Sequence, residues 1–271
     1  MTTLSVLLTT YHGTDVDALT MALDSLLHQT RPADHIVIVE DGPLSPAVAE
    51  AVQQFVDKHA EARRVVLAAN QGSGPASQAG LTTIDSDFIA RLDSDDVAAP
   101  ERFAKQLAYF EAHPQVAVLG TAVVEFQETP GDADRVRALP ESPHALRSYV
   151  KINSPINNPS VMMRTQAIKD VGGYRDVHHM EDYDLYARLI SGGYLLANLP
   201  EPLTFFRVTP EQFQRRTGKE MFAAEKQMQE NLVSYGLVTR PRAMMNLIIR
   251  TLYRSLPTGV LTRVYGALFH K

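Results

Sequence analysis

The chain has 271 residues and a formal net charge of −5, and 45% of its residues are hydrophobic against 21% charged. This balance excludes a disordered chain, and the length is sufficient for one large domain with a full core. The absence of cysteine excludes disulfides, thiolate metal sites and a cysteine nucleophile, and it suits a reducing compartment.

The first part of the chain alternates patterns typical of strands and helices. The apolar run at residues 4–8 is too short to span a bilayer and follows no basic stretch, so we expect a first strand rather than a signal peptide. A helical repeat of apolar residues follows, with Thr14 expected as its N-cap. Further strands are expected at 35–40, 63–68 and 87–92, and further helices at 45–60, after 70–80 and at 100–114. This order predicts a mostly parallel sheet with right-handed crossovers.

The second part of the chain is less regular. We expect extended segments at 116–126 and 194–208, a turn-rich entry to a further strand at 154–164, and helices at 165–171, 180–191 and from 209 onward. Glycine pairs at 172–173 and 192–193 are expected to end two of these helices. We predict a main domain over residues 1–238 and a helical appendage over residues 239–271.

Polar residues follow three of the predicted strands, at the edge where parallel α/β sheets bind their ligands. They are Thr9, Thr10 and Tyr11 after the first strand, Glu40 and Asp41 after the second, and Asp93, Asp95 and Asp96 after the fourth. The acidic turn at 93–96 places three carboxylates within four residues, which repel one another unless a cation is present. Mg²⁺ and Mn²⁺ take oxygen ligands, often one or two carboxylates together with phosphate oxygens. The alternative is a solvated acidic loop or a helix N-cap.

Two further acidic segments admit a binding role and a structural one. Glu40 and Asp41 can accept hydrogen bonds from a base edge or a ribose hydroxyl, but the Asp-Gly pair is also a strong turn signal. Asp182 lies at the opening of a predicted helix. A carboxylate there can take a proton from an attacking hydroxyl, or it can simply complement the helix dipole.

Five segments, taken in order, resemble the family 2 glycosyltransferases of the GT-A fold. They are "SVLLTTYHG", "SLLHQTRPADHIVIVEDG", "NQGSGPASQAGL", "RLDSDDVAAPERF" and "GGYRDVHHMEDYDLYARLISGG", which lie within residues 4–207. The resemblance implies an α/β, Rossmann-like architecture with a mostly parallel central sheet flanked by helices. It also implies kinship with transferases that build bacterial capsule, O-antigen and exopolysaccharide.

By position, the resemblance implies a set of contacts to the nucleotide of a UDP-sugar. Thr9, Tyr11 and Asp41 are expected to contact uracil and ribose, and Asp93 to meet the nucleotide. Glu40 stands where the family usually has aspartate, and we expect it to help bind the nucleotide-sugar.

The resemblance also implies an inverting, metal-dependent mechanism. Asp95 is expected to bind Mn²⁺ or Mg²⁺, and Asp182 to be the catalytic base. An acceptor hydroxyl would lose its proton to Asp182 and attack the anomeric carbon opposite the departing diphosphate, in a pocket that excludes bulk water.

Ser77 and Gln78 depart from the family pattern, because many members carry Arg-Asn at these positions. The usual arginine contact to the nucleotide is therefore missing. Arg215 and Arg216 are possible substitutes that could clamp the diphosphate, or a phosphate of the acceptor. The alternative is that they are the solvated start of a basic helix.

The end of the chain is basic, whereas the rest is acidic. Residues 1–230 hold 20 Lys and Arg against 31 Asp and Glu, while residues 231–271 hold six cations and no anion. Apolar residues at Met244, Leu247, Ile248 and Leu252 have helical spacing, with Arg250 and Arg254 one turn apart, and a second apolar pattern runs from 260 to 269. We expect these helices to lie on an anionic membrane. The alternative is that they pack on the domain or on a second subunit.

Together these features predict an enzyme that transfers a hexose from a UDP-sugar to a saccharide acceptor, one sugar at a time. We expect the acceptor to be lipid-linked and the enzyme to lie in the cytoplasm on the inner face of the cytoplasmic membrane. One alternative is a nucleotidyltransferase, which would need a glycine-rich basic loop after the first strand, where "TTYHGTD" has no Lys or Arg. Another is a catalytically silent nucleotide-sugar-binding protein. The acidic body argues against nucleic-acid binding.

Overall fold

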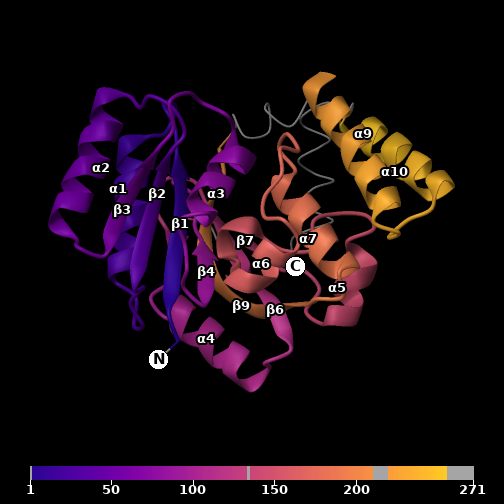
Figure 1. Cartoon of the computed structure of the whole chain (residues 1–271), viewed down its shortest axis with the longest axis horizontal. Coiled ribbons are helices and arrows are strands. Elements are labelled where there is room, and N and C mark those ends of the chain that lie inside the picture. Colours follow the sequence, from indigo (N-terminus) through magenta and orange to yellow (C-terminus); the bar gives the residue numbers. More distant parts are fainter. Residues whose placement is uncertain (1, 133–134, 210–218, 255–271) are drawn as a thin grey trace.

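The computed structural model describes residues 2–132, 135–209 and 219–254 (Figure 1). Its strands are β1 (Leu4–Thr10), β2 (His35–Glu40), β3 (Ala62–Val66), β4 (Phe88–Arg91), β5 (Val97–Ala98), β6 (Val116–Phe126), β7 (Arg135–Arg137), β8 (Met162–Arg164) and β9 (Leu195–Arg207). Its helices are α1 (Val16–Leu27), α2 (Pro46–Lys58), α3 (Ser73–Leu81), α4 (Arg102–Ala112), α5 (Pro143–Tyr149), α6 (Thr165–Asp170), α7 (Glu181–Ser191), α9 (Lys219–Ser234) and α10 (Arg240–Arg254), with a 3-10 turn η1 (Asn158–Ser160).

The strands of the described residues form one mixed sheet in the order β3-β2-β1-β4-β8-β6-β9-β5, and β7 pairs with β6. The strands from β3 to β4 are parallel to one another, and β6 is parallel to β9. Between these two parallel groups lies β8, which is antiparallel to both β4 and β6. The predicted α/β, mostly parallel architecture is confirmed, with β8 as the inserted exception.

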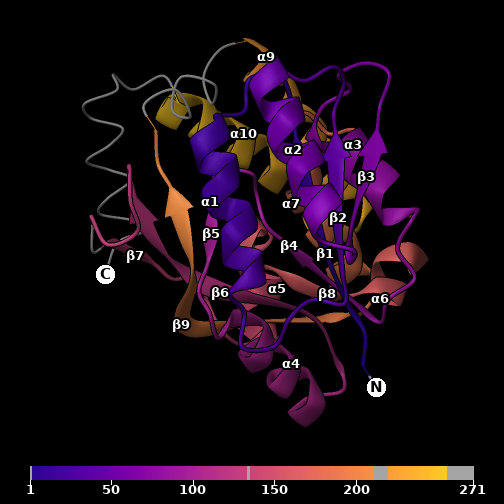
Figure 2. The ribbon, with the colours of Figure 1, turned by 90° about the vertical axis from the view of Figure 1, so that its left-hand side faces the viewer.

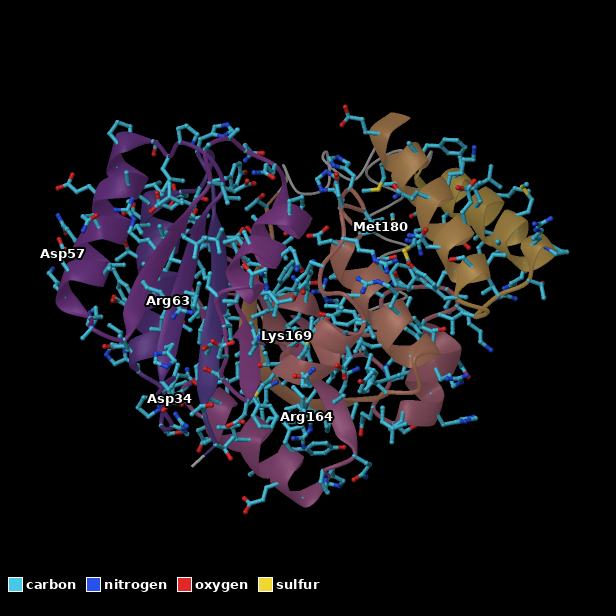
Figure 3. All side chains as sticks on the ribbon, in the orientation of Figure 1. Asp34, Asp57, Arg63, Arg164, Lys169 and Met180 are labelled. Carbon is cyan, nitrogen blue, oxygen red and sulfur yellow. The ribbon has the colours of Figure 1, made fainter. Side chains whose placement is uncertain are left out.

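Helices cover both faces of the sheet (Figures 1 and 2). Alternation along β1 sends Leu4, Val6 and Leu8 into a core shared with α1, α2 and α4. Leu7 points the other way, into a core shared with α3, α5, α6, α7 and α9. Met180, labelled in Figure 3 just before α7, is buried in this second core.

The expected N-cap of α1 was wrong by one residue. Asp15 caps the helix, because its Oδ1 accepts a hydrogen bond of 2.9 Å from the Ala18 amide. The Thr14 hydroxyl is used in the turn after β1, where it accepts from the Tyr11 amide at 3.2 Å and from the Thr10 hydroxyl at 3.0 Å. Thr14 therefore shapes the end of β1 rather than the start of α1.

The C-terminal helices pack on the body of the protein. On α10, Asn246 Nδ2 donates to the Lys151 carbonyl at 2.8 Å, and Arg250 Nε donates to Glu225 of α9 at 2.7 Å. Arg250 thus faces α9 of the same chain. None of the described helices combines the length and apolar content needed to cross a bilayer. The domain boundary at 238–239 stays a prediction, and the apolar pattern at 260–269 lies outside the described residues.

Candidate active site

The acidic turn follows β4 and is tightly folded. The Asp96 amide donates to the Asp93 carbonyl at 3.2 Å. At the end of β9, the Arg207 amide donates to Asp96 Oδ1 at 2.7 Å, and Arg207 Nε donates to the Asp95 carbonyl at 3.0 Å. A residue more than 100 positions away in sequence therefore fixes the backbone that presents Asp95.

The electrostatics of this turn suit a divalent cation. Asp96 is buried, and its Oδ2 has no hydrogen-bond partner among the described residues. Burial first, and then the carboxylates of Asp95 and Asp93, raise the pKa of Asp96 well above its usual value. Asp93 and Asp95 are only half-buried, so they remain open to a ligand. Carboxylate oxygens such as those of Asp93 and Asp95 are ligands that Mg²⁺ and Mn²⁺ take, often only one or two of them together with phosphate oxygens and water. Within the described ranges, no three His, Asp or Glu side chains are grouped so that they could hold a metal ion by themselves.

A buried arginine lies beneath the acidic turn. Arg91, the last residue of β4, is 1% exposed. Its Nη1 donates to the Ser77 hydroxyl at 2.8 Å, and its Nη2 lies 3.5 Å from Asp93 Oδ1. Position 77 of α3 is serine rather than arginine, but the guanidinium of Arg91 on β4 lies next to it. Sequence reasoning missed Arg91, although its spacing of two from Asp93 places both side chains on one face of an extended chain.

The start of α7 meets the acidic turn around Tyr174. Burial raises the pKa of Tyr174 to about 12; the Arg91 guanidinium opposes this shift, whereas the carboxylates of Asp182, Glu181 and Asp93 add to it. The Tyr174 hydroxyl is buried and has no hydrogen-bond partner in the described part of the chain. The Arg91 guanidinium contacts Asp93 at 3.5 Å, and its Cζ lies 5.7 Å from the Tyr174 ring centroid, so the acidic turn and the segment that leads to Asp182 approach the same buried group.

Asp182 lies in the first turn of α7 and is half-buried. The helix has no side-chain cap, and Asp182 Oδ1 accepts from the Tyr183 amide at 2.7 Å. Amides at a helix N-terminus favour an ionised carboxylate, which is the form that a proton acceptor needs.

A buried network holds α7 in place. Asp184 is fully buried and accepts from Arg188 Nε at 2.8 Å, from Asn231 Nδ2 at 2.8 Å and from the Tyr235 hydroxyl at 2.7 Å. Arg188 Nη2 donates in turn to the Gly173 carbonyl at 2.7 Å. The network ties α7 to α9 and to the turn that carries Tyr174.

Close backbone approach brings α3 against the same turn. Gly173 has φ of +68°, and a Cβ there would lie 2.0 Å from Gln78 Oε1, which accepts from the Tyr174 amide at 2.7 Å. A Cβ on Gly74 would lie 2.6 Å from the Arg175 carbonyl oxygen. Gln78 therefore has a structural partner in the turn that leads to α7.

The other predicted nucleotide contacts lie at the ends of β1 and β2. Tyr11 packs its ring over Gly13, where a Cβ would lie 2.7 Å from the ring, and Thr9 is half-buried at the end of β1. Asp41 accepts from the Gln71 amide at 2.7 Å and from the Gly72 amide at 2.9 Å.

Glu40 is buried and pairs through both oxygens with Arg64 of β3. These partners were not visible in the sequence, because they lie 24 to 31 residues away. Arg215 and Arg216 lie outside the described residues.

The chain matches the model of glycosyl transferase family 2 over residues 5–172. This chain belongs to glycosyl transferase family 2. Among curated relatives of this glycosyltransferase, the amylovoran biosynthesis glycosyltransferase AmsE of Erwinia amylovora is 33% identical, with 96% of this chain and 97% of AmsE covered. An Escherichia coli relative named UDP-Gal:alpha-D-GlcNAc-diphosphoundecaprenol beta-1,3-galactosyltransferase is 28% identical, with 98% of this chain and 96% of the relative covered.

Solved structures support the GT-A fold of the transferase. Staphylococcus aureus TarS 1-349 in complex with UDP has a TM-score of 0.66 at 18% identity, with 97% of this chain and 74% of that chain covered. The mannosyltransferase PcManGT of Pyrobaculum calidifontis, in complex with GDP-Man and Mn²⁺, has a TM-score of 0.61 at 15% identity, with 98% and 79% covered. The longer TarS chain is covered over only 44% of its length, at a TM-score of 0.65, 18% identity and 95% coverage of this chain.

Proposed function

We propose that this glycosyltransferase transfers a hexose from a UDP-sugar to a saccharide acceptor during synthesis of a bacterial surface polysaccharide. The observation that carries the proposal is the buried Arg91, which joins Asp93 of the acidic turn to Tyr174 in the segment that leads to Asp182. The names of AmsE and of the E. coli galactosyltransferase support the pathway and the UDP-linked donor. We propose that each reaction adds one sugar.

In the proposed site, the nucleotide lies against the ends of β1, β2 and β4. Thr9, Tyr11 and Asp41 contact uracil and ribose, with Glu40 fixing the end of β2 through Arg64. Asp93 meets the nucleotide. Arg215 and Arg216, which follow β9 in sequence, clamp the diphosphate.

Asp95 holds Mn²⁺ or Mg²⁺ in this proposal, on the backbone that Arg207 fixes. When bound, the cation neutralises charge on the diphosphate. The proposal is supported by the accessible carboxylates of the acidic turn and by the small number of protein ligands that Mg²⁺ commonly takes in the presence of a phosphate.

Asp182 serves as the catalytic base. It takes the proton of the acceptor hydroxyl as the hydroxyl oxygen forms a bond to the anomeric carbon. The bond from that carbon to the diphosphate oxygen breaks on the opposite face, so UDP leaves with the electron pair and the configuration inverts. Closure of the pocket against water favours the sugar hydroxyl as nucleophile.

Calorimetric binding of UDP, GDP, CDP and dTDP, with and without Mn²⁺, tests the donor and the metal. We expect UDP to bind in a metal-dependent manner, and Asp95→Asn to weaken that binding at least tenfold. Asp85→Asn is the matched control, because exposed Asp85 precedes β4 at the opposite end from the acidic turn. The proposal would be overturned if none of the four nucleotides bound, or if Asp95→Asn bound UDP as tightly as the wild type does. UDP binding without sugar transfer to any of a panel of acceptors would favour the silent binding protein.

We further propose that the acceptor is lipid-linked and that α10 lies on the inner face of the cytoplasmic membrane. Ala243 and Asn246 of α10 are buried against the body of the protein. The opposite side presents exposed apolar side chains over an arc of about 140° at about 100° per residue. They are Met244, Met245, Ile248, Ile249 and Leu252. An uninterrupted apolar arc suits insertion into lipid, and the basic end of the chain suits anionic headgroups.

Flotation with vesicles of phosphatidylglycerol and phosphatidylcholine tests this placement. We expect the wild-type chain to float with the vesicles, and the double variant Ile248→Asp/Ile249→Asp to remain at the bottom. Val66→Asp is the control, since Val66 is an exposed apolar residue on β3, away from the arc. Equal flotation of all three chains would contradict the proposal. A wild-type dimer that the double variant dissociates would instead assign the arc to a second subunit.

A further inference from the structure

The position of Arg91 follows from the alternation of β4. Ile89, Arg91 and Asp93 occupy every second position, so their side chains leave the chain on one side. Ile89 belongs to the core shared with α3 and α7. The Arg91 guanidinium therefore lies between that core and the acidic turn, where water has almost no access.

A buried guanidinium must be held by partners, because loss of hydration is costly. Arg91 has one short hydrogen bond, to the neutral hydroxyl of Ser77, and a longer contact with Asp93. Its Cζ lies 5.7 Å from the Tyr174 ring centroid, and its Nε has no hydrogen-bond partner among the described residues. Burial lowers the pKa of Arg91, but Tyr174, Asp93 and Glu181 outweigh it and the group stays cationic.

Asp93 depends on Arg91 in turn. Its side chain is 35% exposed, and no other described side chain hydrogen-bonds or ion-pairs with its carboxylate. The 3.5 Å contact is therefore the link that limits where this carboxylate points. Ser77, which is fully buried on α3, limits in turn where the guanidinium lies.

We propose that Arg91 is a positioning residue that holds the Asp93 carboxylate toward the nucleotide of the donor, and that Ser77 sets the position of Arg91. This inference rests on the proposed function. It assigns nucleotide affinity to a chain of contacts from α3 through β4 to the acidic turn. If Arg91 only fills space beneath the acidic turn, substitutions of its contact partners change the stability of the protein but not its affinity for the nucleotide.

Removing the Ser77 hydroxyl tests the chain of contacts with little disturbance. In calorimetry with UDP and Mn²⁺, we expect Ser77→Ala to weaken binding about fivefold, as loss of one hydrogen bond would. Ser86→Ala is the matched control, because buried Ser86 loses a 2.7 Å hydrogen bond to Ser5 at the other end of β4. We expect it to bind UDP as the wild type does.

A double-mutant cycle adds a readout that a structural role would not move. We expect Asp93→Asn to weaken UDP binding, and Ser77→Ala/Asp93→Asn to bind no more weakly than Asp93→Asn alone. Arg91→Lys keeps the positive charge but loses the planar guanidinium with its two parallel N–H donors. We expect it to raise the KM of the donor but not that of the acceptor.

Two results overturn the inference while leaving the proposed function intact. They are wild-type UDP affinity in Ser77→Ala, and effects of Ser77→Ala and Asp93→Asn that multiply in the double variant. If the wild-type chain itself binds no UDP, the proposed function falls and the inference falls with it.

Discussion

Replacing Asp184 by asparagine should destabilise the protein by about 3 kcal/mol. The carboxylate is fully buried and accepts three hydrogen bonds, and its partner Arg188 is almost as deeply buried. Breaking a buried ion pair from one side costs about 3–5 kcal/mol, because the remaining charge is uncompensated. The asparagine oxygen can still accept two bonds, and Arg188 keeps its bond to the Gly173 carbonyl, so the lower end of that range applies.

Urea denaturation measures this loss, provided the slope with urea is unchanged. For a chain of this size the same loss lowers the melting temperature by about 5 °C. The double variant Asp184→Asn/Arg188→Met removes both charges and should recover part of the stability. A single variant within 1 kcal/mol of the wild type would show that the network does not hold α7 as described.

Three further changes have expected outcomes. Asp182→Asn should lower kcat by a factor of about 10²–10⁴ and leave UDP affinity unchanged, and wild-type turnover would remove its role as base. Gly80→Ala would place a Cβ 2.3 Å from Leu7 Cδ1, and urea denaturation should show a loss of about 1–3 kcal/mol. Hydrogen bonds from the amide and hydroxyl of Thr3 lower the pKa of Asp87. Its stabilisation is therefore present above the usual carboxyl pKa of 3.8 and is lost as pH falls through the lower folded value. Urea midpoints should show that Asp87→Asn weakens the protein at pH 7 and that the difference shrinks near pH 3; a constant difference would contradict this.

Local periodicity was enough to locate the long elements. The residues of β2 and β6 were predicted at the positions where they occur, because each strand is rich in β-branched apolar residues and has clear boundaries. The short strands β5 and β7 and the helix α5 were missed, since two to seven residues carry too little pattern. The antiparallel direction of β8 depends on partners far away in sequence, so no local signal reports it.

The candidate site also has a part that the sequence predicts and a part that it does not. Residue types and spacing pointed to the acidic turn and to Asp182, and the structure places both near Tyr174. The partners of those residues could not be predicted. Arg207, at the end of β9, fixes the acidic turn, and Arg64 of β3 forms an ion pair with Glu40. These contacts form only when strands that are distant in sequence pair, whereas the apolar pattern of a segment depends only on residues that are close in sequence. The individual roles of the site residues stay predictions.

The place of β8 also governs how the chain can fold while it is being made. The edge of β4 is complete at residue 91, but its outer neighbour β8 ends at residue 164. At about 5–20 residues per second, the ribosome adds the intervening chain in about 4–15 s. A sheet of β1 to β4 formed during that time would present an unpaired strand edge at β4, and such edges are surfaces from which aggregation begins. Slow codons between residues 92 and 160 should therefore lower the soluble yield of this transferase more than slow codons placed after residue 164.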